Sequence, residues 1–388
     1  MDDRHLTSPA PGDPGRTTPD AELTAADTLS AAEKERLRQG CERWLGGHGP
    51  RTPTDALAEL STIPAGELTA DDYGDGGVVA TLETEVRELL GKPAAVFMPS
   101  GTMAQQIALR IHADRRGRRV VAFHPTCHLE VHEDKAYQRL HGLIGRPLGD
   151  GRGLLTLADL EALDEPLAAL LIELPQREIG GRLPSWDDLA RQVAYARERG
   201  AAVHLDGARL WESGPFYGRP LSDIAGLFDT VYVSFYKGLG GLAGSMLLGD
   251  EEVVREARAW RRRHGGTLRH LWPYAAAGLA GLRLRLPRMD AYAAHARVVA
   301  AALAGIDGVE VVPDPPQTPM MHLHLRTDPA AVTAGIRRLA TERRLWTWGG
   351  SSPTDTPGIR RVELTVGDAT LAIPLDEVAD AVRALLPA

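Results

Sequence analysis

The 388-residue chain has little cysteine and no long hydrophobic run. Its two cysteines, Cys41 and Cys127, cannot supply the disulfide framework of a secreted protein, and their spacing fits no zinc site, so we expect no bound metal. A continuous apolar stretch of about 20 residues, the length of a membrane span, is absent. The first residues also lack the basic start and apolar core of a signal peptide. These absences predict a cytoplasmic protein without a membrane helix.

An excess of positive charge is missing as well. The chain has 44 Lys and Arg against 52 Asp and Glu, a net charge of -8, which argues against nucleic acid or an anionic membrane as a partner. With 43% hydrophobic residues the chain can bury a large core. Because single cores stop growing at roughly 250 to 300 residues, we expect a large and a small domain.

Changes of composition divide the chain into three parts. Residues 1–29 are rich in Pro, Gly, Asp and Thr and are predicted to form a flexible tail. Residues 30–286 alternate helical patterns with short apolar strands, which is typical of an α/β domain; a first helix is expected over 31–45, capped by Ser30 and ended by Gly46 and Gly47. Residues 287–388 are predicted to form helix, strand and helix, a smaller α+β domain.

Residues 204–249 contain two buried strands that deliver polar groups at their ends. The first ends in Asp206 and Arg209, and the second, over 231–235, stops just before Lys237 and a run of glycines. A desolvated lysine becomes a neutral nucleophile for Schiff-base chemistry, and an aspartate is the partner that a pyridinium nitrogen needs. A solvated lysine at a helix start is the ordinary interpretation of Lys-Gly alone. Asp206, Arg209 and Lys237 in this order favour a pyridoxal 5'-phosphate (PLP) enzyme.

This stretch resembles the threonine aldolase and β-eliminating lyase family, since HLDGARL at 204–210 and KGLG at 237–240 match its motifs. The resemblance covers about 72–286 and extends more weakly to the C-terminus. It implies a fold-type I, aminotransferase-like large domain with a mostly parallel seven-stranded sheet, and PLP held by Lys237. It also implies a homodimer or homotetramer with shared active sites.

The resemblance assigns further cofactor contacts. Ser100, Gly101 and Thr102 follow a strand and open a helix, where free N–H groups favour a phosphate; alone they are more often a simple cap. Followed by Met-Ala-Gln-Gln, they resemble the family's phosphate-binding segment. Ser234 can add a hydroxyl. Arg269 lies in a glycine-rich run like the family segment that reaches a neighbouring subunit's phosphate, although a solvated charge run is an equal alternative.

Histidine and arginine positions complete the expected site. His128 matches the family histidine that stacks on the PLP ring, whereas His124 and His132 are expected to be surface or satisfied histidines. Arg361, on the last strand, is expected to hold the substrate carboxylate, chosen by strand parity with Thr365. The other expected substrate contacts are Gln176, Arg177 and Tyr73, the last in a Tyr-Gly-Asp loop. For Arg177 a salt bridge with Glu178 or Glu173 is at least as natural.

Two departures from the family pattern bear on the reaction. The family's Glu-x-x-His has Gln176 in place of its histidine, and glutamine cannot accept a proton at neutral pH. The Arg-Ser-Asp-Thr segment near the family's N-terminus has no counterpart. The predicted function is a PLP-dependent aldehyde-lyase that cleaves a β-hydroxy-α-amino acid to glycine and an aldehyde. Alternatives are another PLP reaction, namely β-elimination, transaldol exchange or racemisation, or a PLP-binding relative without catalysis. A nicotinamide-dependent dehydrogenase is excluded, because the chain lacks a Gly-x-Gly-x-x-Gly turn after an early strand.

Overall fold

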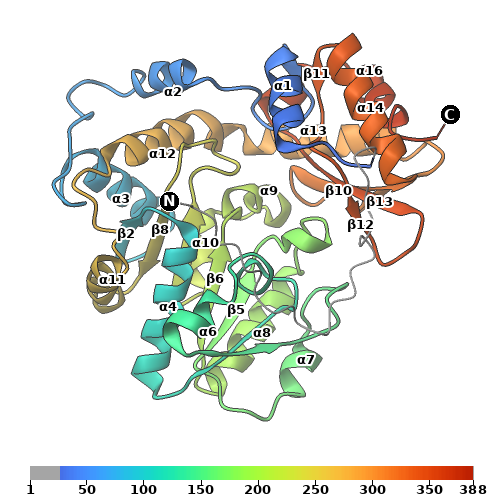
Figure 1. Ribbon diagram of the computed structural model, residues 1–388. Coiled ribbons are helices and arrows are strands. Elements are labelled where there is room, and N and C mark those ends of the chain that lie inside the picture. Colours follow the sequence, from blue (N-terminus) through green and yellow to red (C-terminus); the bar gives the residue numbers. More distant parts are fainter. Residues whose placement is uncertain (1–26, 388) are drawn as a thin grey trace, which may run out of the picture.

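A seven-stranded sheet forms the centre of the larger part of the computed structural model, which describes residues 27–387 (Figure 1). Six strands run in one direction, and only β8 runs against its neighbours β2 and β7. The sheet is therefore mostly parallel, as predicted. In spatial order the strands are β2 (Ala94–Met98), β8 (Ser245–Gly249), β7 (Thr230–Ser234), β6 (Ala202–Gly207), β5 (Ala169–Glu173), β3 (Val120–Phe123) and β4 (Ile144–Pro147).

Helices cover both faces of this sheet, which explains why β5, β6 and β7 are buried along their whole length. One face packs on α4 (Gly101–Arg116) and α11 (Glu251–Arg263), and the other on α3 (Gly77–Leu89), α8 (Trp186–Glu198) and α12 (Trp272–Arg285). Between these elements lie α5 (His128–Val131), α6 (Ala136–His141), α7 (Leu157–Glu161), η1 (Arg177–Ile179), η2 (Leu210–Glu212), α9 (Gly214–Tyr217) and α10 (Leu221–Gly226).

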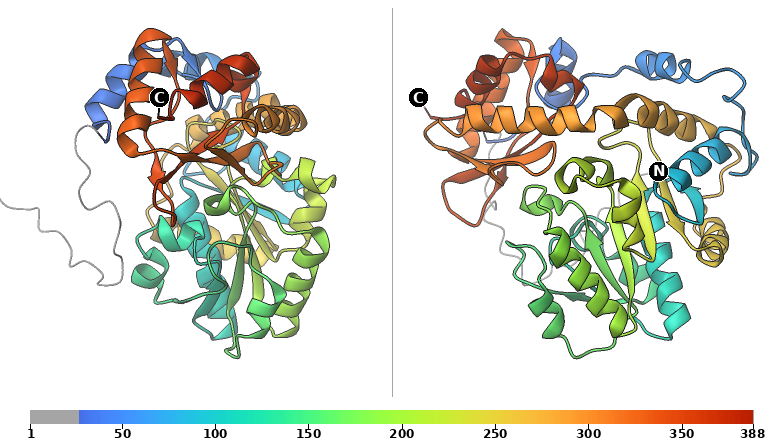
Figure 2. Two further views of the ribbon diagram at one scale, coloured as in Figure 1. Left: turned by 90° about the vertical axis from the view of Figure 1, so that its right-hand side faces the viewer. Right: turned by 180° about the vertical axis from the view of Figure 1, so that it is seen from behind.

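The C-terminal part is built on a second, antiparallel sheet in the order β12 (Ser352–Pro353), β13 (Ile359–Thr365), β10 (Met320–Arg326) and β9 (Val309–Val312). On β13 buried residues alternate with half-buried ones, so that Arg361, Glu363 and Thr365 share the face that looks toward the larger part. The helices of this part are η3 (Leu286–Arg288), α13 (Met289–Leu303), α14 (Pro329–Glu342), α15 (Asp368–Leu371) and α16 (Leu375–Arg383). Figure 2 shows α12 and α13 following one another across both parts.

The N-terminal segment crosses both parts of the molecule (Figure 1). Helix α1 (Ala31–Gly40) packs on α14, and α2 (Pro53–Leu60) packs on α12. The predicted helix over 31–45 is too long: Cys41 is extended, and β1 (Arg43–Trp44) pairs with β11 (Leu345–Trp346), which replaces the helical hydrogen bonds. Residues 1–26 of the expected tail lie outside the described residues, and Leu29 at its end is buried.

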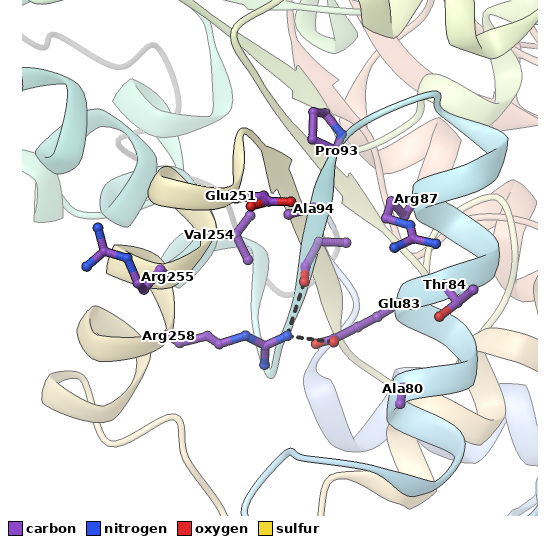
Figure 3. Close-up of a pocket in the computed structure, with 11 residues that line it drawn as sticks. Ala80, Glu83, Thr84, Arg87, Pro93, Ala94, Glu251, Val254, Arg255 and Arg258 are labelled. Atoms are coloured by element: carbon purple, nitrogen blue, oxygen red, sulfur yellow. Dashed lines mark hydrogen bonds and ion pairs between the residues drawn. The ribbon is translucent and has the colours of Figure 1, made fainter.

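Side chains occupy the outer edge of strand β2. The Phe97 N–H donates to Glu83 at 2.8 Å, and the carbonyls of Ala95 and Phe97 accept from Arg258 at 3.3 Å and Arg261 at 2.9 Å. Figure 3 shows Arg258 reaching from α11 to Glu83 on α3 across this edge. In the described part of the chain, no helix is long and apolar enough to span a membrane.

Candidate active site

The carboxyl ends of β5, β6 and β7 converge on one polar site. Glu173, the last residue of β5, pairs in register with Asp206 near the end of β6, and Lys237 follows β7 by three residues. Because neighbouring parallel strands end at the same edge of a sheet, these groups come together although they are far apart in the sequence.

Lys237 is largely desolvated. Burial lowers its pKa below the usual value, the nearby Arg209 guanidinium lowers it further, and Asp206 and Glu173 act in the opposite sense. A lowered pKa increases the fraction of free amine near neutral pH, which is the form that attacks a carbonyl carbon.

Asp206 is completely buried, and one of its carboxylate oxygens is unsatisfied. Its Oδ1 accepts the Ala208 N–H at 3.0 Å, whereas Oδ2 has no hydrogen-bond partner within residues 27–387. Burial raises the Asp206 pKa, and the positive charge of Lys237 opposes that effect. A buried carboxylate oxygen needs a donor, and the N–H of a protonated pyridine ring is one. The residues present therefore fit the PLP ring.

Glu173 organises the loops above the sheet, a role that the sequence did not reveal. Its two oxygens accept the backbone N–H groups of His128 at 2.9 Å and Arg177 at 3.0 Å. Burial and the neighbouring Asp206 carboxylate raise the pKa of Glu173 to about 7. This carboxyl thus fixes the starts of α5 and η1, the two segments that carry His128 and Arg177.

His128 is oriented by a second unpredicted carboxylate. Its Nδ1 lies 3.1 Å from Oε1 of Glu133, whose side chain is fully buried and also accepts from Gln105 and Gln106 on α4. Nε2 of His128 has no hydrogen-bond partner among the described residues. The other two histidines of this loop are both bonded, His124 to Gly153 O at 2.7 Å and His132 to Glu178 at 2.9 Å.

The expected phosphate segment is the start of α4. The Ser100 hydroxyl accepts the Met103 N–H at 3.3 Å, which caps the helix, and Gly101 packs so tightly on the hydroxyl of Tyr232 that any Cβ would clash with it. Thr102 follows as the second hydroxyl residue of this helix start. Ser245, which the sequence did not single out, donates to Ser100 O at 2.9 Å. Ser234 ends β7 opposite Ser245 and is fully buried.

Two arginines from the larger part meet a glutamate of the smaller one. Glu363 Oε2 accepts from Arg177 Nε at 2.9 Å, and its Oε1 lies 3.5 Å from Arg209 Nη2. On the other side of Arg209, Nε is 4.0 Å from Glu212, a fully buried residue whose carboxyl oxygens have no hydrogen-bond partner within the described chain. Burial raises the Glu212 pKa to about 7.

Arg361 is also paired. Its guanidinium donates to the Glu178 backbone carbonyl at 3.2 Å and to the Glu178 carboxylate at 3.3 Å. Glu178 in turn accepts from Arg177 Nη1 at 2.8 Å, which is one of the two salt bridges expected for Arg177. The three arginines Arg177, Arg209 and Arg361 are therefore paired with three carboxyl groups, Glu178, Glu212 and Glu363.

Within the described residues, three other predicted positions form no hydrogen bond or ion pair with Lys237, Asp206, His128 or the three arginines. Gln176 is buried and points to Thr126 Oγ1 at 3.4 Å. Tyr73 and Arg269 lie together on two exposed loops, with the guanidinium 5.3 Å from the ring centroid and a Tyr73 N–H to Arg269 O bond of 3.0 Å. Cys127 is buried, and burial raises its pKa, which suits a packing residue. Within the described residues no cluster of His, Cys, Asp and Glu could hold a metal ion.

The architecture is that of the fold-type I PLP-dependent enzymes. Within that class, residues 52–326 match the Beta-eliminating lyase family, and the chain belongs to it. It is 40% identical to a putative L-allo-threonine aldolase from Listeria monocytogenes, whose crystal structure matches with a TM-score of 0.85 over 91% of this chain and 98% of that one.

Two further relatives agree with this assignment. The structure of a putative aromatic amino acid beta-eliminating lyase/threonine aldolase from Exiguobacterium is 39% identical, with a TM-score of 0.84 over 90% of this chain and 99% of that one. Low-specificity L-threonine aldolase 1 of Arabidopsis thaliana is 27% identical over 310 residues, which is 77% of this chain and 86% of that protein.

Proposed function

We propose that the protein is a PLP-dependent aldehyde-lyase that cleaves a small β-hydroxy-α-amino acid, threonine or a relative of it, to glycine and an aldehyde. The observation that carries this proposal is the desolvated Lys237 amine beside a buried Asp206 oxygen that lacks a donor, at the carboxyl edge of the sheet. Membership of the β-eliminating lyase family and the named threonine aldolase relatives support it.

Different residues of the chain would bind different parts of the cofactor. PLP, when bound, supplies a ring that accepts the electron pair released as the Cα–Cβ bond breaks. Lys237 would hold the cofactor aldehyde, Asp206 Oδ2 would accept from the ring N–H, and the Ser100–Thr102 helix start would take the phosphate, with Ser234 behind it. His128 would lie against the ring face.

Cleavage also needs a group that removes the proton of the substrate β-hydroxyl. Gln176 cannot do so, and we assign this role to Nε2 of His128. Glu133 accepts the Nδ1 proton of this histidine, which leaves the lone pair on Nε2. Both ring nitrogens of His124 are engaged, and Nε2 of His132 is bound to Glu178. His128 is preferred to His132 because it also matches the family histidine that stacks on the PLP ring.

The substrate carboxylate would bind to the group of arginines at the site. Arg361, Arg177 and Arg209 lie together and are paired with Glu178, Glu363 and Glu212. The substrate carboxylate would replace one of these carboxylates on Arg361 and would fix the amino acid so that its Cα–Cβ bond stands across the ring plane. Tyr73 and Arg269, exposed on one protomer, would face the active site of a neighbouring subunit in a homodimer or homotetramer.

The test is product identification. Purified protein with added PLP is incubated separately with threonine, allo-threonine, phenylserine and serine, and the products are identified. Glycine plus the matching aldehyde supports the lyase reaction. Pyruvate alone would indicate β-elimination instead, and an epimer alone would indicate racemisation. For the cofactor, borohydride reduction should attach a chromophore to the peptide that contains Lys237, and Lys237→Ala should lose both the chromophore and the activity. A chromophore retained in Lys237→Ala contradicts the choice of lysine.

A further inference from the structure

The turn that follows Lys237 is held from outside by three side chains. The carbonyl oxygens of Gly238, Leu239 and Gly240 are consecutive, and each accepts a hydrogen bond from a different side chain: His48 Nε2 at 2.8 Å and Arg51 Nη1 of the N-terminal segment for Gly238 and Gly240, and Arg285 Nη1 of α12 at 3.0 Å for Leu239. Three consecutive carbonyls cannot be satisfied inside so short a turn, and the donors come from segments distant along the chain.

The glycines of this turn show how closely the surroundings approach it. A Cβ on Gly240 would lie 3.2 Å from the His48 ring and 3.4 Å from the Arg285 guanidinium, and a Cβ on Gly238 would lie 2.5 Å from Glu212. On the side of α12, a Cβ on Gly281 would lie 2.3 Å from Leu239 O. The turn is therefore enclosed on several sides, and its position is determined by these neighbours.

The donors are themselves fixed by carboxylates. Arg285 and Arg51 both bind Glu59 of α2, and Arg285 Nε lies 3.4 Å from Asp368 at the start of α15. His48 Nδ1 lies 3.2 Å from the Asp368 carboxylate and 3.4 Å from the Asp368 backbone nitrogen. Because a carbonyl only accepts, Nε2 of His48 carries the proton, and the ring connects Gly238 O to Asp368.

We propose that His48, Arg51 and Arg285 are positioning residues for Lys237, and that His48 couples the lysine turn to Asp368 in the C-terminal part of the chain. The N-terminal segment around 46–59, whose purpose its sequence does not reveal, then serves to fix the direction of the Lys237 amine. The inference rests on the proposed role of Lys237. His48, Arg51 and Arg285 would act on Lys237 through the backbone of its turn and would touch neither substrate nor cofactor.

A conservative pair of substitutions tests His48. His48→Leu removes the donor to Gly238 O, whereas His48→Gln keeps an amide N–H at a similar distance along the side chain. Arg118→Leu is the matched control, because Arg118 also donates to a backbone carbonyl, Leu167 O at 3.0 Å, but at the opposite end of the sheet. Arg51→Met is a second test variant, because it removes the hydrogen bond to Gly240 O and leaves the His48 imidazole unchanged.

Hydrogen exchange, followed by mass spectrometry on the peptide over 237–241, is the primary measurement. It needs neither cofactor nor substrate, so its result is independent of whether the proposed reaction occurs. We expect exchange in this peptide to be about fivefold faster in His48→Leu and in Arg51→Met, as expected for one lost hydrogen bond. Exchange should be near wild type in His48→Gln and Arg118→Leu. Wild-type exchange in His48→Leu and Arg51→Met overturns the proposal.

The PLP-loaded protein supplies a second readout. In His48→Leu the pH midpoint of the bound cofactor's absorbance should shift, and kcat should fall while KM changes little. In His48→Gln the pH midpoint and kcat should return to their wild-type values. Equal midpoints in wild type and His48→Leu, or equal defects in the Leu and Gln variants, contradict a positioning role. Should wild type produce no glycine, the proposed reaction fails, while the exchange and absorbance results still decide the role of His48.

Discussion

Glu133 places a carboxylate oxygen 3.1 Å from Nδ1 of His128, and this contact decides which nitrogen of the imidazole is free. A carboxylate only accepts, so Nδ1 carries the proton and Nε2 holds the lone pair. The same carboxylate is bound by two glutamines of α4, which lock its orientation.

Substitution of Glu133 by glutamine should therefore impair proton transfer more than binding. An amide can donate to Nδ1 and move the proton to Nε2, which can then no longer accept one. We expect kcat to fall on the order of 10²-fold, the lower range for a positioned general base, with KM within a few-fold of wild type. Steady-state glycine release measures both constants. Glu130→Gln is the control, because Glu130 lies on the same segment but bonds Tyr137. Equal activity of the two variants would argue against a His128 base.

The sequence predicts those parts of the site that depend on local pattern. Asp206, Arg209 and Lys237 are recognisable because polar residues that end apolar strands seldom serve packing alone. The carboxylates Glu133, Glu173, Glu212 and Glu363 are not recognisable in this way. Glu363 and Glu173 act on groups from other segments; Arg177 and Glu363, for example, are 186 residues apart. Glu133 and Glu212 lie close in sequence to His128 and Arg209, but only the fold buries them and turns them toward these groups.

Contacts between segments far apart in the sequence also explain why the predicted first helix is too long. A capped helical pattern followed by two glycines predicts a helix over 31–45, yet the chain leaves the helix after Gly40. Arg43 and Trp44 pair instead with Leu345 and Trp346 of the C-terminal part. Tertiary pairing of this kind overrides local propensity, and a single sequence does not record it.

Glu363 should weaken the binding of substrate, because it competes for Arg177 and Arg209. Glu363→Gln removes this negative charge, so we expect KM for the amino acid to fall by a factor of about 2 to 5, the effect of one partly exposed ion pair. The inhibition constant of a simple carboxylate such as acetate should fall in parallel. Glu310→Gln, which removes an exposed carboxylate from the same small sheet, is the control. A higher KM in Glu363→Gln would show that Glu363 holds the arginines in place.

Glu212 should make stability depend on pH. Burial raises its pKa in the folded protein to about 7 from its ordinary value of 4.5, so the folded state binds this proton more tightly than the unfolded state. Its contribution is fully present below about pH 4.5 and is lost as the pH rises through about 7. In Glu212→Gln this slope, at most about 1.4 kcal/mol per pH unit, should disappear. Urea unfolding of wild type and variant at several pH values from about 5 to about 8, the range over which the proton is lost, measures the difference, and parallel curves would contradict it.

The side chains along the outer edge of β2 should protect the sheet from pairing with another chain. An edge strand with free N–H and C=O groups is a template for aggregation, and here Glu83 and Arg258 occupy those groups of Phe97 and Ala95. Glu83→Leu leaves the Phe97 N–H without an acceptor, which should lower the free energy of unfolding by about 1 to 3 kcal/mol and increase light scattering at high protein concentration. Glu88→Leu is the matched control, since Glu88 is a solvent-facing carboxylate near the end of the same helix.

A third variant separates the lost acceptor from the lost charge. Glu83→Gln keeps an oxygen that can accept the Phe97 N–H but cannot form the ion pair with Arg258, which in the native protein measures 2.7 Å. We expect it to recover most of the stability and to remain unaggregated, because the edge group is still covered. If Glu83→Leu is as stable and as monodisperse as Glu88→Leu, the hydrogen bond to the edge contributes nothing measurable, and the sheet must be protected by α3 and α11 alone.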